Sequence, residues 1–165
     1  MQNDVYLVAL GTCDPQYEEL FRQLAERFPK KVGARIAYDN SLAHKIEGGA
    51  DIFLMPSRYE PCGLNQIYSL KYGTVPVVRA TGGLDDTIEQ YEAVTGQGTG
   101  FKFTAYSGQA LLECLRQALY VYSTDHGAWQ KLVRNGMQRD FSWNASAAEY
   151  DNLFQAVVGQ AKSAS

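Results

Sequence analysis

Two short segments of the sequence combine residue types that could bind an anion next to a carboxylate. In the first, residues 56–66 (PSRYEPCGLNQ), Glu60 precedes Pro61 and a helix is expected to open at Gly63. Such a helix would point the free amides of residues 63–65 toward a phosphate, and its dipole would favour the negative charge. Gly63 has no Cβ, so the backbone could approach the ligand closely. This segment therefore predicts an anion site at the start of a helix.

The second segment is Thr81-Gly82-Gly83-Leu84, which by itself is weaker evidence because glycine pairs are common in turns. Taken alone, both segments are also compatible with ordinary tight turns, and Glu60 with a solvated surface residue. A carboxylate at the mouth of an anion site would repel phosphate unless it points at sugar hydroxyls or at a developing positive charge. If Glu60 points at a developing positive charge, it would take part in catalysis.

The elements that must position these loops alternate along the chain. Short apolar runs predict strands, and apolar residues spaced three and four apart predict helices. The predicted strands are 5–10, 32–38, 52–55, 75–78 and 100–103, and the predicted helices are 15–28, 41–49, 63–72, 84–91, 107–122, 125–139 and 144–158. This order predicts an α/β fold, a Rossmann-like parallel sheet with helices on both faces. The two candidate loops would then lie at the carboxyl ends of strands, where such sheets bind ligands.

Composition limits the classes of partner. The 165 residues include 15 Lys and Arg against 18 Asp and Glu, a net charge of −3, which argues against a nucleic-acid surface. No apolar run is long enough to predict a membrane span, and the first residues do not resemble a signal peptide. The three cysteines are widely spaced, which favours reduced thiols and a cytoplasmic location. No set of residues has the spacing of a metal site.

The stretch from Gly48 to Leu84 resembles the nucleotide-sugar loop region of bacterial glycogen synthases and plant starch synthases, which are retaining glycosyltransferases of the two-domain B-type fold. The resemblance extends through residues 32–38, 100–103 and 140–143, and covers about residues 5–158. Its most specific part is the pair of motifs Glu60-Pro61-Cys62-Gly63-Leu64 and Thr81-Gly82-Gly83-Leu84, whose combined spacing outweighs the simple-turn interpretation.

The resemblance implies that residues 1–165 form one domain, the nucleotide-sugar-binding domain in the C-terminal half of such a fold. It also implies that this domain lacks its first strand–helix segment, which carries the family's diphosphate-binding Arg and Lys. The N-terminal acceptor domain is likewise expected to be absent from the chain. On this basis the isolated chain is expected to be inactive and to bind ADP weakly.

The implied activity is transfer of glucose from ADP-glucose to the non-reducing end of an α-1,4-glucan with retention of configuration. No cofactor is expected, because ADP-glucose is the donor substrate. The α-glucan acceptor would bind through the N-terminal domain, and no nucleic acid or membrane would be involved. The location would be cytoplasmic, or the plastid if the source is a plant. A stand-alone nucleotide- or sugar-binding module without transferase activity is the alternative, and Glu60 discriminates between the two because only transfer requires it.

The resemblance also implies roles for individual residues. Glu60 matches the glutamate that contacts the donor glucose and helps to stabilise the transferring sugar. The other implied donor-binding residues are Tyr38, beside the adenine; Cys62, Gly63, Leu64 and Asn65, in the turn that holds sugar and diphosphate; and Thr81, Gly82 and Gly83, along the sugar end. Asn65 departs from the threonine that is usual in the bacterial family.

Two further residues have open interpretations. Arg79, at the end of a predicted strand, could meet either a phosphate or an acidic neighbour. His44 is expected to be a surface or helix-packing histidine, because no orienting partner for a catalytic base is identifiable.

Overall fold

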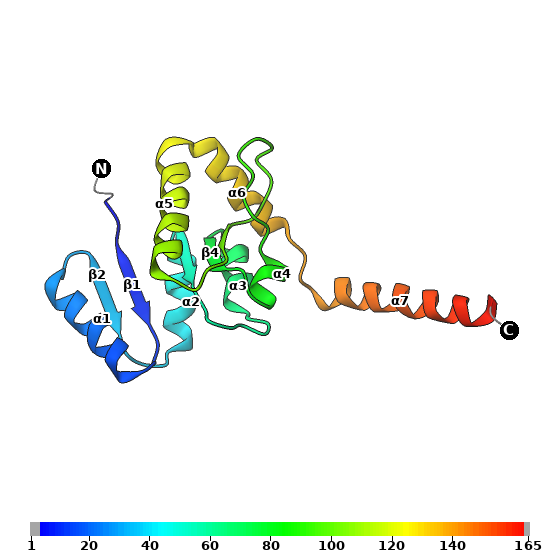
Figure 1. The fold of residues 1–165 in the computed structure, drawn as a ribbon, viewed down its shortest axis with the longest axis horizontal. Helices are drawn as coiled ribbons and strands as arrows, with labels where there is room; N and C mark the ends of the chain where they lie inside the picture. The colour runs from blue at the N-terminus through cyan, green and yellow to red at the C-terminus, as the bar shows by residue number, and fades with distance from the viewer. Residues whose placement is uncertain (1–3, 164–165) are drawn as a thin grey trace.

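The computed structural model describes the backbone of residues 4–163 and the side chains of residues 4–159. Parallel strands alternate with helices over the first two thirds of this range, and the last third is helical (Figure 1). The strands are β1 (Leu7–Leu10), β2 (Val32–Arg35), β3 (Ile52–Met55), β4 (Val75–Arg79) and β5 (Phe101–Phe103). The helices are α1 (Pro15–Arg27), α2 (Asn40–Gly49), α3 (Asn65–Tyr72), α4 (Gly83–Thr87), α5 (Gly108–Thr124), α6 (His126–Gln138) and α7 (Trp143–Ser163).

Short polar side chains begin several of these helices. Asp14 accepts a hydrogen bond from the Gln16 amide at the start of α1, and Ser107 does the same for Ala110 at the start of α5. The cap of α2 is Asp39, whose carboxylate accepts a hydrogen bond from the Leu42 amide at 2.9 Å.

The strands form two parallel sheets and not the single sheet expected from the sequence. One sheet has the order β1-β2, with Leu7 opposite Val32, and the other has the order β3-β4-β5, with Ile52 opposite Val75. β1 is an edge strand of the smaller sheet and β3 an edge strand of the larger one. Every strand pair within the two sheets is parallel, so the predicted α/β class is confirmed.

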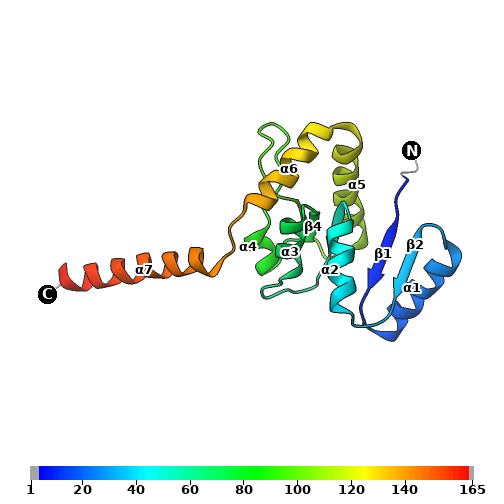
Figure 2. The ribbon, with the colours of Figure 1, turned by 180° about the vertical axis from the view of Figure 1, so that it is seen from behind.

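The core is built around β4, the central strand of the larger sheet. Alternate residues of a strand point to opposite faces. Val75 and Val77 pack with the side chains of α5 and α6, including Trp129 and Leu132, whereas Val78 packs on the other face with Leu70, Leu84 and Ile88 from α3 and the α4 region. The expected arrangement of helices on both faces is therefore present, and Figure 2 shows it from behind. This packing fixes the carboxyl ends of β3 and β4, where the candidate loops begin.

The last helix, α7, extends away from the rest of the molecule (Figures 1 and 2). Large apolar side chains remain exposed along it, including Trp143 at 89% and Phe154 at 63%. Among the described side chains of this helix, residues 143–159, none belongs to the two core clusters.

Candidate functional site

The two candidate loops lie against each other, backbone to backbone, at the carboxyl ends of β3 and β4. The Gly83 amide donates a hydrogen bond to the Glu60 carbonyl at 3.0 Å. A Cβ on Gly83 would lie 2.0 Å from the Cys62 carbonyl oxygen, and a Cβ on Gly82 would lie 2.2 Å from the Glu60 carbonyl oxygen. Only glycine permits an approach this close, and Gly82 also has a φ of +47°. The Thr-Gly-Gly segment therefore positions the loop that carries Glu60.

The helix after this loop begins two residues later than expected, at Asn65 instead of Gly63. Its cap, Leu64, has no side-chain acceptor, so the amides of the first turn receive no capping bond from it. The free amides were expected at residues 63–65. In the structure they lie at the start of α3, from Asn65 onward. Gly63 precedes the helix in a turn with a φ of +72°, which explains why glycine occupies that position.

Glu60 is half-buried in the loop that leads to these amides. Within residues 4–159 it takes part in none of the ion pairs, although its own backbone carbonyl is engaged by Gly83. Two residues later, Cys62 carries an exposed free thiol. The arrangement offers a ligand one carboxylate and a set of helix-terminal amides on adjoining segments, so it can contact an anion and a neutral or cationic group together.

Gln66 supports this turn, a role that the sequence reasoning missed. Its side chain is fully buried, and its Nε2 donates to the carbonyls of Cys62 at 2.8 Å and Gly63 at 3.0 Å. Its Oε1 atom has no hydrogen-bond partner among the described residues. One signal in the sequence could have indicated this role. Gln66 is a polar residue one position inside a helix that has no side-chain cap, and its amide group can bind carbonyls of the preceding turn that would otherwise lack a partner.

Arg79 has a different role from either of the two that the sequence left open. Its guanidinium donates to the carbonyls of Ser57 at 2.8 Å and Thr104 at 3.2 Å, and also to that of Arg58. Its partners are therefore backbone groups of the Glu60-bearing loop and of the segment after β5. Arg79 ties these two segments to the end of β4.

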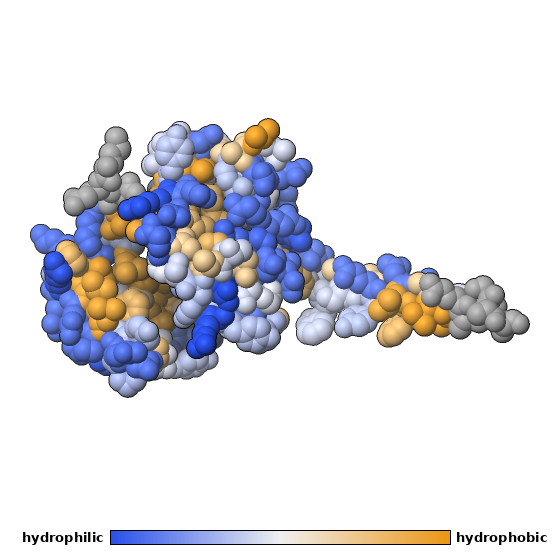
Figure 3. Space-filling model, viewed as in Figure 1, coloured by the Kyte–Doolittle hydropathy of each residue, from blue (hydrophilic) through white to orange (hydrophobic). Residues whose placement is uncertain are grey.

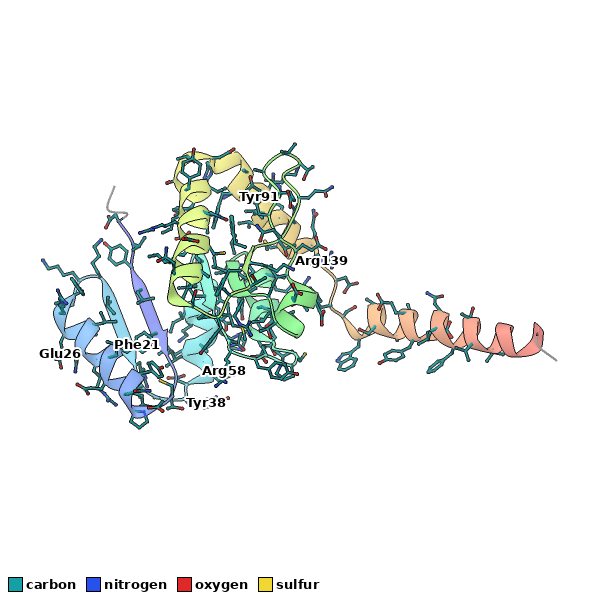
Figure 4. The ribbon with its side chains drawn as sticks, viewed as in Figure 1. Phe21, Glu26, Tyr38, Arg58, Tyr91 and Arg139 are labelled. Atoms are coloured by element: carbon teal, nitrogen blue, oxygen red, sulfur yellow. The ribbon has the colours of Figure 1, made fainter. Side chains whose placement is uncertain are left out.

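Tyr38 is the predicted donor-binding residue that the structure leaves apart from the others. It follows β2 at the carboxyl end of the smaller sheet, and 88% of it is exposed. Figure 4 shows Tyr38 and Arg58 at the same edge of the molecule, where the strands end. The structure therefore brings Glu60, Cys62, Gly82 and Gly83 into direct contact, while Tyr38 remains on the same edge without packing against them.

His44 is a helix-packing residue, as expected. Its Nδ1 lies 3.1 Å from the Tyr72 hydroxyl, and its ring packs against that of Tyr68 with centroids 5.2 Å apart. The same nitrogen lies 3.8 Å from the carboxylate of Glu47, which is buried between α2 and α3. Burial raises the pKa of Glu47, and the nearby His44 lowers it by a smaller amount.

Metal-binding and membrane-spanning features were also sought in the described part of the chain. It contains no group of three or more His, Cys, Asp or Glu side chains that could hold a metal ion. No helix within residues 4–163 combines the length and the hydrophobicity that a bilayer span requires.

The sequence is similar to those of curated bacterial glycogen synthases. It is 59% identical over 154 residues to the glycogen synthase of Koribacter versatilis, a match that covers 93% of this chain and 32% of that protein. It is 49% identical over 157 residues to the glycogen synthase of Thermotoga maritima, covering 95% of this chain and 32% of that protein. The chain thus spans about a third of the length of these relatives.

Solved structures give a consistent picture of the fold. The catalytic domain of starch synthase IV from Arabidopsis thaliana, bound to ADP and acarbose, is 28% identical with a TM-score of 0.72, and the match covers 96% of this chain and 39% of that one. Sucrose-phosphate synthase from Thermosynechococcus elongatus shares the fold at 21% identity, with a TM-score of 0.64 over 95% of this chain and 46% of that one. The resemblance to glycogen and starch synthases is confirmed. The family model for glycosyl transferases group 1 matches residues 1–135, and the chain therefore belongs to that family.

Proposed function

We propose that this chain is the nucleotide-sugar-binding part of a glucan synthase that transfers glucose from ADP-glucose to the non-reducing end of an α-1,4-glucan with retention. The observation that carries the proposal is the backbone contact between the two loops, which fixes the segment that carries Glu60 directly ahead of the free amides at the start of α3. Similarity to glycogen synthases and to a starch synthase solved with ADP and acarbose supports the choice of donor and acceptor.

In the proposed reaction, bond cleavage at the anomeric carbon releases ADP and leaves positive charge on the glucose ring. The first amides of α3, from Asn65 onward, would stabilise the departing diphosphate, because they point partial positive charge out of the helix start. Glu60 would lie near the sugar and stabilise the developing oxocarbenium character. Thr81, Gly82 and Gly83 would line the sugar end, and Cys62, Gly63 and Leu64 the turn between sugar and diphosphate.

The remaining parts of the site are proposals of the same kind. Tyr38 would stack on the adenine, for which its exposed ring is available. The glucan acceptor would bind through an N-terminal domain outside residues 1–165. ADP-glucose would act as donor without a cofactor, and the free thiols of Cys13 and Cys62 suit a cytoplasmic location.

A chimeric enzyme tests this function. The matched 154-residue region of the Koribacter versatilis relative is replaced by the corresponding part of this chain, and transfer of labelled glucose from ADP-glucose to glycogen is measured. We expect the chimera to be active and the isolated chain to be inactive, because one wall of a cleft cannot orient both reactants. A folded chimera that binds ADP-glucose but transfers no glucose would favour a binding module and refute the proposal.

A further inference from the structure

The guanidinium of Arg79 joins two segments that each carry an exposed tyrosine. On one side it donates to the carbonyl of Arg58, the residue before Tyr59. On the other side it donates to the carbonyl of Thr104 at 3.2 Å, two residues before Tyr106. The two tyrosines therefore lie on neighbouring backbone segments that one side chain holds together.

These two segments adjoin the proposed donor site along the edge where the strands of the larger sheet end. In the order β3-β4-β5, the Glu60 loop follows the first strand, residues 81–83 follow the second, and Tyr106 follows the third. All three strands are parallel, so the segments leave the sheet at the same edge. Tyr106 is therefore one strand beyond the residues proposed to contact the donor glucose, and Tyr59 directly precedes Glu60.

The ring of Tyr106 is supported on one face and open to a ligand. The Arg79 guanidinium lies over it, 5.6 Å from the ring centroid, while 65% of the residue is exposed. Ser107, the next residue, caps α5 by accepting a hydrogen bond from the Ala110 amide at 3.2 Å. Tyr59 is 71% exposed. An exposed ring on a backbone that is already held in place can bind a ligand at a small cost in conformational entropy.

The chemistry of this edge suits a sugar ring. A tyrosine has an apolar ring and a polar hydroxyl, so it can cover the C–H face of a sugar and hydrogen-bond to its hydroxyl groups. In Figure 3 the lower edge of the body, where Figure 4 places Tyr38 and Arg58, is mainly white to blue. Strongly hydrophobic side chains gather instead over the β1–α1–β2 unit and on α7. The centre of a protein–protein interface is more apolar than this edge.

We propose that Tyr106 and Tyr59 bind a glucosyl unit of the α-glucan acceptor, next to the unit that receives the transferred glucose. The inference rests on the proposed function, which supplies the acceptor. It adds an acceptor contact from this domain, whereas the sequence led us to expect that the N-terminal domain binds the glucan. Arg79 would act as a positioning residue, because its guanidinium holds both tyrosine-bearing segments.

Titration of the chain alone with maltoheptaose, an α-1,4-glucan, tests the contact without requiring glucose transfer. The ring resonances of Tyr59 and Tyr106 are followed by NMR. We expect both to shift with a common Kd of about 1–10 mM, because two exposed rings form only a small site. Tyr120, which lies on α5 and is 68% exposed, should not shift and serves as the internal reference.

Steady-state kinetics of the chimeric enzyme separates acceptor binding from donor binding. Tyr106→Ala should raise the KM for maltoheptaose by about 10-fold and leave the KM for ADP-glucose unchanged, because the ring contacts only the acceptor. Tyr106→Phe keeps the ring and should stay within about 3-fold of the parent. Tyr120→Ala removes a ring of similar exposure elsewhere and should change neither KM, so it is the matched control.

Two results would overturn the inference. One is the absence of a shift at both tyrosine rings up to about 20 mM maltoheptaose. The other is an active chimera in which Tyr106→Ala leaves the KM for maltoheptaose unchanged; if that variant also melts at a lower temperature, the ring packs against another part of the enzyme. A folded chimera that transfers no glucose would instead refute the proposed function, and the titration of the chain alone would still decide whether the two tyrosines bind a glucan.

Discussion

Replacing Gly83 by alanine would test whether the contact between the two loops positions Glu60. The new Cβ would lie 2.0 Å from the Cys62 carbonyl oxygen and 2.6 Å from the Cys62 carbonyl carbon, both of which are backbone atoms that no rotamer change can move. Ordinary contact begins at 3.4 Å. The loop must therefore move away by about 1.4 Å, a displacement that a packed interior resists.

The expected cost has two parts. Forcing an additional methyl group into a packed site costs about 1–3 kcal/mol. The hydrogen bond from the Gly83 amide to the Glu60 carbonyl, now 3.0 Å long, would be lost or weakened at about 0.5–1.5 kcal/mol. We expect the free energy of unfolding to fall by about 2–4 kcal/mol. In the chimeric enzyme, a shift of Glu60 by about 1 Å should also lower kcat by about 100-fold.

Denaturant unfolding of the chain gives the first quantity, and steady-state kinetics of the folded chimera gives the second. Gly49→Ala is the matched control, because nothing lies within 4 Å of a Cβ there and the residue has no positive φ. That variant should be neutral or slightly stabilising at the end of α2. If Gly83→Ala unfolds within about 0.5 kcal/mol of the parent and keeps full activity, the two loops do not depend on this contact.

Three other changes separate the roles of nearby residues. Glu60→Gln in the chimera should lower kcat by about 100-fold or more while the KM for ADP-glucose changes much less, and a correctly folded, fully active variant would end its catalytic assignment. Gly63→Ala should act mainly on the KM for donor and on ADP affinity in calorimetry, because its φ of +72° and a Cβ 2.5 Å from Gln66 Oε1 would distort the turn before the α3 amides; an unchanged KM would contradict this. Glu47→Gln should stabilise the chain at about pH 7 and have no effect at about pH 4, because burial raises the pKa of Glu47 in the folded state and the folded chain loses stability as pH rises through that pKa. Equal melting curves of variant and parent at both pH values would show that burial does not penalise the Glu47 charge.

The elements were largely predictable because local patterns specify them. Apolar spacing predicted helices over 15–28 and 63–72; α1 begins at Pro15, and α3 ends at Tyr72 before Gly73, whose φ is +83°. Pro76 lies within β4, one residue before that strand begins to pair with β5. The missing amide of Pro76 therefore costs no bond in that ladder.

The division into two sheets was less accessible, because it depends on pairing between distant segments. The run at Ile52–Met55 has the composition of a strand paired on both sides, so the sequence predicted one continuous sheet. The apolar composition shows that these residues are suited to a strand with neighbours on both sides. It does not show whether a second neighbouring strand is present.

The site was predictable in its residues and less so in its geometry. The spacing of Glu60 and Gly83 indicated two loops at one sheet edge, and the structure joins them. The partners of Gln66 and Arg79 could not be identified from the sequence, because they are backbone carbonyls, which have the same chemistry whatever the residue type. Only a structure can show which carbonyls a turn leaves free.

The projecting helix α7 determines the dimensions of the molecule in solution. A compact chain of 165 residues would have a radius of gyration of about 15 Å, and a straight helix of 21 residues adds about 30 Å of length on one side. Small-angle X-ray scattering would therefore report the direction of α7 more than the packing of the core. A radius near the compact value would mean that α7 folds back onto the body. Its exposed side chains, Leu153, Phe154, Val157 and Val158, would then be covered.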